Sequence, residues 1–286
     1  MIDLHTHTTY SDGTWSVKKL LTEAEKSNIE LLSITDHNSV EAYYEIQEND
    51  YSKLFSNRII KGVELNVIAN GSSIELLVYD YDLDAMNEWC LNKYKKPDEK
   101  ELFREYNELY DSSIKNGIVL SERHYNFNGL FPIDVIYHDI KSHPENESKY
   151  PSDAWNNYSS FIRYFAYDPD FPTYVNLLGL FPSIEETVKM IRNTKGKIFI
   201  AHIYKYPNRH NELLEYLVSN KLIDGIEVYH SYFIKEQMDY LYNYCKMKGL
   251  LISGGSDCHG EKKLTRRIGV GYNNLNIDRS VVNDWI

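Results

Sequence analysis

The first 80 residues alternate short apolar segments with one helical pattern, an order typical of β/α units. The helix is indicated by apolar residues spaced three and four apart, Val17, Leu20, Leu21 and Ala24. Short apolar runs predict strands at residues 1–4, 29–34, 59–68 and 74–81. This part of the chain therefore favours an α/β sheet over a sandwich of strands alone.

The same rhythm returns near the end of the chain. Helical patterns cover residues 183–193, 212–219 and 235–248, and Gly196 and Gly249 mark the ends of the first and last. Apolar strands are predicted between and after them, at residues 197–201, 223–229 and 250–253. Repeated alternation of strand and helix predicts a parallel, barrel-like sheet.

Residues 85–178 interrupt this rhythm with a charged, helix-like stretch and then a segment rich in Tyr, Asn, Asp and Pro. We interpret them as a mainly helical insertion, with residues 1–84 and 179–286 forming the barrel. Two roles remain open for the insertion. Its tyrosines can pack an amphipathic surface over the barrel, or the segment can act as a cap that covers the substrate.

Composition narrows the class of protein. The chain has 286 residues, 42% of them hydrophobic, and a formal net charge of −11. Such a charge argues against a surface that scaffolds nucleic acid or binds an anionic membrane, although nucleic acid stays possible as a substrate. The three cysteines are scattered, and neither a signal peptide nor a transmembrane run is evident, so we expect a soluble cytoplasmic protein.

The candidate chemistry begins with His5 and His7, which follow the first predicted strand. Residues two apart in a strand face the same side, so both imidazoles can bind one cation. Taken alone, such a pair is structural or incidental about as often as it is functional. The case depends on what the other strand ends carry.

Further acids and imidazoles follow the next strands. Asp12 lies in a Ser-Asp-Gly turn, His37 follows the second strand, and Glu64 lies within the third. Taken alone, the Asp-Gly pair is typical of a plain turn or a helix cap. Side chains at successive strand ends nevertheless converge on one mouth of a barrel, where active sites of such folds form.

Two late strands complete the set. His202 follows a very apolar strand, a place where a buried core histidine is common. Asp257 and His259 lie one residue apart in a glycine-flanked turn after the last strand. The combined ligands are His, Asp and Glu without a thiolate, which suits Mn, Zn or Fe(II).

With these motifs the sequence resembles the PHP (polymerase and histidinol phosphatase) family of metal-dependent phosphoesterases. The resemblance covers residues 1–82 and 183–272. It rests on Asp3-Leu-His-Thr-His7, Ser11-Asp12-Gly13, Ile34-Thr-Asp-His37, Gly62-Val-Glu64, Ala201-His202 and Gly255-Ser-Asp-Cys-His-Gly260. Residues 161–175 and Ile268-Gly269 are similar to a branch with nucleoside 3′,5′-bisphosphate phosphatases and exonucleases acting on short RNA.

The resemblance implies a distorted (β/α)7 barrel with two to three divalent metal ions. The first ion would be held by His5, His7, Glu64 and Asp257. Glu64 would bridge to a second ion that His202 also binds, and the third would be held by Asp12, His37 and His259. Where the family usually carries a histidine in the strand after Glu64, this chain has Glu75, which favours a harder ion or a weak second site.

The implied reaction is attack on phosphorus by a metal-bridging water held by Glu64 and Asp257. Candidates for contacts with a substrate phosphate are Lys205, Arg123 and His124, although an exposed loop lysine is an equal reading of Lys205. The basic stretch at residues 262–267 is more typical of a solvated surface.

The expected substrate is a small phosphorylated molecule, a phosphomonoester or a short nucleotide. Histidinol phosphate is an alternative within the same class. A metal-dependent amidohydrolase is a second enzymatic alternative, although that superfamily typically uses a bridging lysine and a final lone Asp. The third alternative is a catalytically weak binding module, which only the substitution at Glu75 favours.

Overall fold

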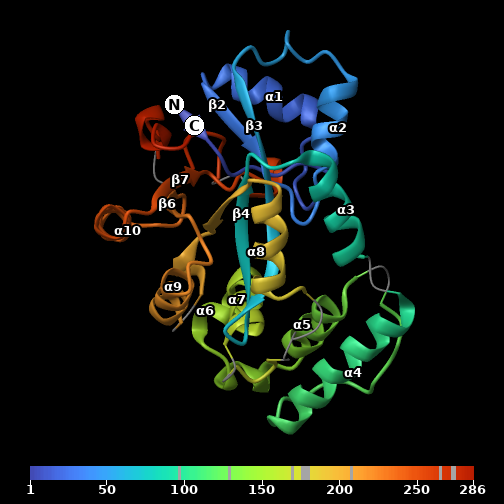
Figure 1. Cartoon of the computed structure of the whole chain (residues 1–286). Coiled ribbons are helices and arrows are strands. Elements are labelled where there is room, and N and C mark those ends of the chain that lie inside the picture. The colour runs from blue at the N-terminus through green and yellow to red at the C-terminus, as the bar shows by residue number, and fades with distance from the viewer. Residues whose placement is uncertain are drawn as a thin grey trace.

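The computed structural model describes residues 1–95, 98–127, 130–168, 171–174, 181–206, 209–263, 266–271 and 275–286. At its centre lies one seven-stranded sheet, in which the spatial order of the strands follows the sequence. The strands are β1 (Ile2–Asp3), β2 (Leu31–Ile34), β3 (Arg58–Ala69), β4 (Ser72–Tyr79), β5 (Lys197–Ile200), β6 (Gly225–His230) and β7 (Leu251–Gly255) (Figure 1).

The sheet curves until its two edges meet. The Leu4 amide donates to the Gly254 carbonyl at 3.1 Å, and the Asp257 amide donates to the His5 carbonyl at 2.8 Å. These bonds bring the end of β7 beside the end of β1, so the seven strands form a nearly closed barrel. The predicted distorted α/β barrel is confirmed.

One strand departs from the predicted parallel arrangement. β1 to β3 run parallel to one another, as do β5 to β7, but β4 is antiparallel to both of its neighbours. The reversal occurs at Asn70-Gly71, where both residues have positive φ, 47° and 75°. Two such residues between paired strands form the tight hairpin turn that Asn-Gly favours.

Helices cover the outside of the barrel: α1 (Val17–Lys26), α2 (Glu41–Glu48), α3 (Leu83–Lys93), α8 (Ile184–Asn193), α9 (His210–Ser219) and α10 (Lys235–Lys248) (Figure 1). In α1 the Ser16 side chain caps the first turn by accepting from the Lys19 amide. The helix then buries the four apolar residues that the sequence pattern indicated. α10 ends at Gly249, whose φ of 69° stops the helix.

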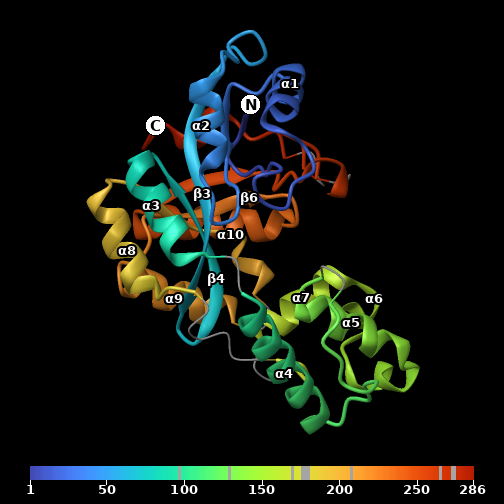
Figure 2. The same ribbon diagram turned by 90° about the vertical axis from the view of Figure 1, so that its right-hand side faces the viewer.

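A helical cap, defined here as α4 to α7, extends from one side of the barrel (Figure 2). Its elements are α4 (Glu99–Lys115), α5 (Pro132–Ser142), the 3-10 helix Pro144–Lys149, α6 (Ser152–Asn156) and α7 (Tyr158–Tyr167). They enclose a separate hydrophobic core that includes Tyr106, Leu109, Ile136, Ile140 and Phe161. α7 contacts β4, which joins the cap to the barrel.

The predicted start of the insertion, residue 85, lies inside α3. Met86 and Cys90 of this helix are buried in the main core with the barrel helices. The predicted end, at residues 178 and 179, lies outside the described residues. Among the helices that the structure describes, none is both long enough and apolar enough to cross a membrane.

Candidate metal centre

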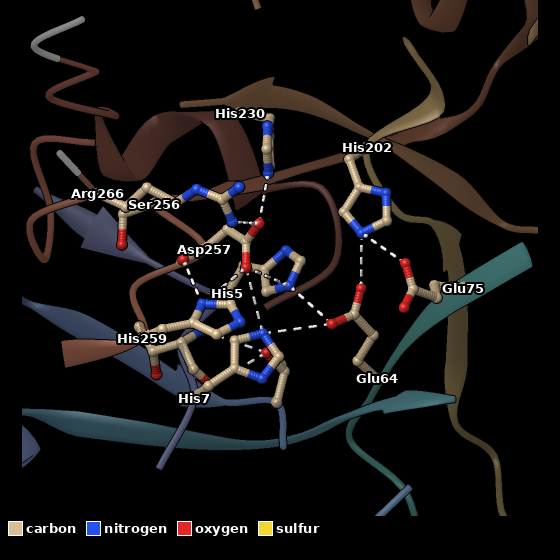
Figure 3. A network of polar contacts seen from close by, with 12 residues as sticks. His5, His7, Glu64, Glu75, His202, His230, Ser256, Asp257, His259 and Arg266 are labelled. Atoms are coloured by element: carbon tan, nitrogen blue, oxygen red, sulfur yellow. Dashed lines mark hydrogen bonds and ion pairs between the residues drawn. The ribbon is translucent and has the colours of Figure 1, made fainter. Parts of the chain in front are cut away.

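All nine predicted metal ligands meet at one end of the barrel. They come from separate places in the sequence, since β1, β2, β5 and β7 each end just before at least one of them and Glu64 and Glu75 lie within β3 and β4. Figure 3 shows the side chains of most of them turned toward one another, namely His5, His7, Glu64, Glu75, His202, Asp257 and His259. The set consists of His5, His7, Asp12, His37, Glu64, Glu75, His202, Asp257 and His259.

The first group joins His5 and His7 to two carboxylates. The Nε2 atoms of His5 and His7 lie 3.1 and 3.3 Å from the Glu64 Oε2 atom. The same two nitrogens lie 3.7 and 3.4 Å from the Asp257 Oδ1 atom. Ligand atoms about 2.0–2.2 Å from a single ion lie roughly 3–3.6 Å from one another, so these distances fit one cation.

The second group shares Glu64 with the first. The His202 Nε2 atom lies 2.8 Å from Glu64 Oε1 and 3.2 Å from Glu75 Oε2. The His37 Nδ1 atom is 3.4 Å from Glu64 Oε2 and 3.7 Å from Glu75 Oε1. Glu75 thus faces the centre although it replaces an expected histidine, and a second ion held here would be bound mostly by carboxylates.

The third group gathers around Asp12. Its Oδ1 atom lies 3.1 Å from the His259 Nε2 atom and 3.7 Å from the His37 Nε2 atom. The His259 Nδ1 atom lies 2.8 Å from the Asp257 carbonyl, which can only accept a hydrogen bond. Nδ1 therefore donates this bond, and Nε2 faces Asp12.

The electrostatics of this cluster suit cations. The His7 Nε2 atom is buried and faces the carboxylates of Glu64 and Asp257. Burial lowers the pKa of His7, but hydrogen bonds to Asp257 and Glu64 outweigh it and raise that pKa to about 9. Burial raises the pKa of Glu64, yet the neighbouring His5 and His37 hold it well below its usual range. Ionised carboxylates thus lie among crowded imidazoles, an arrangement that divalent ions would stabilise by taking the place of protons.

The backbone is strained at two of the predicted ligands. His202 and Asp257 have φ values of 28° and 56°, a region that non-glycine residues rarely adopt. Nearby, a Cβ atom at Gly255 would lie only 2.4 Å from the His5 amide nitrogen. Glycine at this position permits the close approach of β7 to β1 that places Asp257 beside His5 and His7.

Two basic residues lie near the centre, Lys205, which was a candidate for contact with a substrate, and Arg266, which was not. Lys205 donates to the Asp257 Oδ2 atom at 2.8 Å, so its ammonium lies at the cluster. Arg266, only 4% exposed, also bonds this oxygen and stacks over the Tyr232 ring at 4.3 Å. The prediction of a solvated surface at residues 262–267 is therefore wrong for Arg266. The side chains of Lys262 and Lys263, and residues 264–265, lie outside the described part.

Arg123 and His124 do not join the cluster. Arg123 bonds Asn107 and Asp111 and stacks over Tyr110 at 4.4 Å. The His124 ring lies 6.0 Å from the ring of Tyr106. These contacts tie both residues to α4 of the cap, and the contact of either residue with a substrate phosphate stays a prediction.

Three acidic residues and one histidine near the centre had no role in the predictions: Asp3, Asp36, Glu227 and His230. Asp36 accepts from the Thr8 amide at 2.7 Å and from the Thr8 and Ser11 hydroxyls, so it fixes the loop that carries Asp12. In the sequence, these four residues could have been found as polar residues that lie within an apolar strand or shortly after one.

Comparison with known proteins agrees with the resemblance seen in the motifs. A sequence profile of the PHP domain matches residues 3–166, more than half of the chain. The chain is also 31% identical over 101 residues to the DNA polymerase/3'-5' exonuclease PolX of Bacillus subtilis, a match covering 30% of this chain and 16% of that protein. The matched segment is thus a small part of that relative.

Two solved structures share the fold. One is a protein of Bifidobacterium adolescentis with a provisional assignment as a metal-dependent phosphoesterase; it is 22% identical with a TM-score of 0.62, over 99% of this chain and 94% of its own. The other, an amidohydrolase of Chromobacterium violaceum with bound sulfate and no metal, is 21% identical with a TM-score of 0.65, over 94% and 89%. Likeness at these identities concerns the fold alone.

The motifs, the barrel and the profile match all indicate the same class of protein. The clusters of His, Asp and Glu at the strand ends, together with the profile, support a metal-dependent hydrolase. The match over more than half of its length establishes that the chain belongs to the PHP domain family.

Proposed function

We propose that this protein hydrolyses phosphate esters with two or three bound divalent metal ions. One observation carries the proposal. The nine candidate ligands form overlapping groups, and within each group the ligand atoms lie within 4.8 Å of one another. Because Glu64 and His5 belong to more than one group, the groups describe adjacent ions rather than separate sites. Adjacent ions are the arrangement used for displacement at phosphorus.

Charge supports an anionic substrate. Without ions, the four carboxylates of Asp12, Glu64, Glu75 and Asp257 are balanced by Lys205, Arg266 and protonated imidazoles such as that of His7. Divalent ions would take the place of those protons and add positive charge, which attracts a phosphate dianion. Binding of the substrate is thereby coupled to binding of the metal.

The roles of the chain's own residues follow from their contacts. Bound divalent cations would supply the acidity that activates water and the positive charge that neutralises phosphate oxygens. Lys205 uses one of its three N–H groups on Asp257, so the others remain available to a substrate oxygen. Asp257 turns its Oδ1 atom toward His7 and its Oδ2 atom toward Lys205. It therefore lies between the imidazole and the ammonium group and fixes their relative positions.

The proposed substrate is a phosphomonoester or a short nucleotide, held partly by the barrel rim. The helical cap is the segment that would contact the rest of such a molecule. Its exposed aromatic residues, among them Tyr125 and Phe131, could stack on a base. Histidinol phosphate stays an alternative within the same class of esters.

The test is a substrate screen with the metal content measured on the same sample. Protein loaded with Mn²⁺ is mixed with nucleoside monophosphates, nucleoside 3′,5′-bisphosphates, short oligonucleotides and histidinol phosphate. We expect release of inorganic phosphate or of nucleotides from one of these classes, and none after treatment with a chelator. Cleavage of amides without release of phosphate would favour an amidohydrolase, and no reaction with any compound would favour a binding module.

A further inference from the structure

Strand β6 places two buried polar side chains, Glu227 and His230, beside the predicted metal ligands. Both are fully buried. The pairing of β6 with β7 shifts register between Glu227 and Tyr229, which marks a β-bulge. A bulge changes the side on which the following residues point, so residues three apart can face the barrel interior together. Figure 3 shows His230 directed at Asp257.

Glu227 joins two of the histidines in the cluster. Its Oε1 atom lies 2.7 Å from the His5 Nδ1 atom. Its Oε2 atom accepts from the backbone N–H of His202 at 2.7 Å. One carboxylate thus fixes the ring of His5 and also the strained backbone at His202, although the two residues lie far apart in the sequence.

These contacts define which nitrogen of His5 faces the ions. Both oxygens of Glu227 lie 2.7 Å from a nitrogen atom, and a carboxylate oxygen accepts hydrogen bonds from such nitrogens. The His5 Nδ1 atom must then carry the proton that points at Glu227. The His5 Nε2 atom, 3.1 Å from Glu64, is left to act as the ligand.

The alternative role for Glu227 is that of a ligand to a further ion, since His5, Glu227 and His230 also lie close enough to hold one. The hydrogen bonds argue against it. His230 Nδ1 accepts from the Tyr232 amide at 3.2 Å, so its Nε2 carries the proton and donates to Asp257 Oδ2, also at 3.2 Å. Both oxygens of Glu227 already accept hydrogen bonds as well, so a cation at this place would have to displace the bonds to the His5 Nδ1 atom and the His202 amide.

We propose that Glu227 is a positioning residue, which holds His5 in the Nδ1-protonated tautomer and orients His202 for metal binding. The inference rests on the proposed metal-dependent function. A carboxylate that accepts from the second nitrogen of a metal-binding histidine fixes the ring and makes its ligating nitrogen more basic. Removal of such a carboxylate weakens metal binding without removing a ligand.

The experiment compares Glu227→Gln with Asp224→Asn in otherwise intact protein. Glutamine matches the shape of Glu227, but its amide can accept from only one of the two N–H groups and turns its own N–H toward the other. Asp224 is a matched control, because it directly precedes β6 and accepts from the Ile198 amide of β5 at 2.8 Å. Its other partner is Arg192, so it touches none of the candidate ligands.

Binding of Mn²⁺ to the chelator-treated proteins is measured by calorimetry, together with the thermal unfolding of each. We expect Glu227→Gln to weaken the tightest Mn²⁺ site about 10- to 100-fold, and Asp224→Asn to leave it unchanged. Equal Mn²⁺ affinity in wild type and Glu227→Gln would overturn the proposal. If Mn²⁺ binding follows the prediction but wild type cleaves no phosphate ester, then Glu227 keeps its assigned role and the proposed substrate class fails.

A second measurement on the wild-type protein covers the case in which Glu227→Gln does not fold. Nitrogen-15 NMR of histidine-labelled, Zn²⁺-loaded protein reports which ring nitrogen of each histidine carries hydrogen. We expect His5, assigned by its loss in His5→Gln, to show a protonated Nδ1 and a metal-bound Nε2. A metal-bound Nδ1 on His5 would contradict the proposal.

Discussion

The barrel mouth and the helical cap bury their side chains for different reasons. At the barrel mouth, fully buried groups such as His5, Glu64 and Asp257 carry charge and lie against one another. The core of the cap is made of apolar and aromatic side chains, with Tyr106, Phe161 and Phe171 at its centre. Burial of charged groups at the barrel mouth costs folding free energy, whereas burial of apolar area stabilises the cap. Bound metal ions should therefore stabilise the barrel mouth and leave the stability of the helical cap unchanged.

The largest effect is expected at Asp257, which faces the imidazoles with one oxygen and Lys205 and Arg266 with the other. Asp257→Asn removes the charge without changing the shape of the side chain. We expect Mn²⁺ affinity to fall by more than about 100-fold, because loss of a ligand exceeds the 10- to 100-fold typical of residues behind a ligand. Calorimetry with Mn²⁺ checks this, and wild-type affinity in the variant would remove Asp257 from the site.

The matching change in the cap is Asn146→Ala. The buried Asn146 amide bonds the Val119 backbone on both its N–H and its carbonyl, and also the Ile140 carbonyl. We expect the cap to lose about 1–3 kcal/mol of stability, because buried backbone groups lose their partners. Limited proteolysis should show faster cleavage within residues 98–168 while the Mn²⁺ content stays constant. Loss of bound Mn²⁺ in this variant would mean that the two regions depend on each other.

A smaller change is expected from Glu75→His, which restores the residue type usual in the family. An imidazole in place of the carboxylate should shift the second site toward softer ions, with Zn²⁺ binding about tenfold tighter relative to Mn²⁺. Competition between the two ions, followed by metal analysis, measures the ratio. An unchanged ratio would show that Glu75 is not a ligand.

The smallest effect concerns Glu105, a half-buried residue of α4. Burial and the neighbouring Glu108 raise the pKa of Glu105 to about 7. The folded cap therefore holds this proton more tightly than the unfolded chain, so stability declines as the pH rises from about 4.5 to 7. Glu105→Gln should remove that decline. The expected change in the free energy of unfolding is less than about 1 kcal/mol, because solvent screens the group. Thermal unfolding at pH 5 and pH 8 tests it, and an equal pH dependence in both proteins would contradict it.

Much of the fold followed from local pattern. The helix at residues 17–26 and the last strand and helix pairs were predictable because the apolar periods are regular. The antiparallel direction of β4 was missed, since a buried run of apolar residues has no direction. The turn residues Asn70 and Gly71 held that information.

The residues of the candidate site were likewise predictable only in part. The convergence of residues that follow strands, such as His5 and His37, was predictable because strand ends meet at one mouth of a barrel. Arg266 was not, since its burial depends on how the segment after β7 folds back over Asp257. Glu227 and His230 were missed because the bulge in β6 alters the alternation on which strand reasoning relies.

The most direct test of the central claim is the metal content of protein purified without chelator, measured by mass spectrometry alongside phosphate release. The account predicts at least two divalent transition metal ions per chain, loss of phosphate release when they are removed, and its return when Mn²⁺ is added back. A metal-free protein that releases phosphate at the full rate would contradict it.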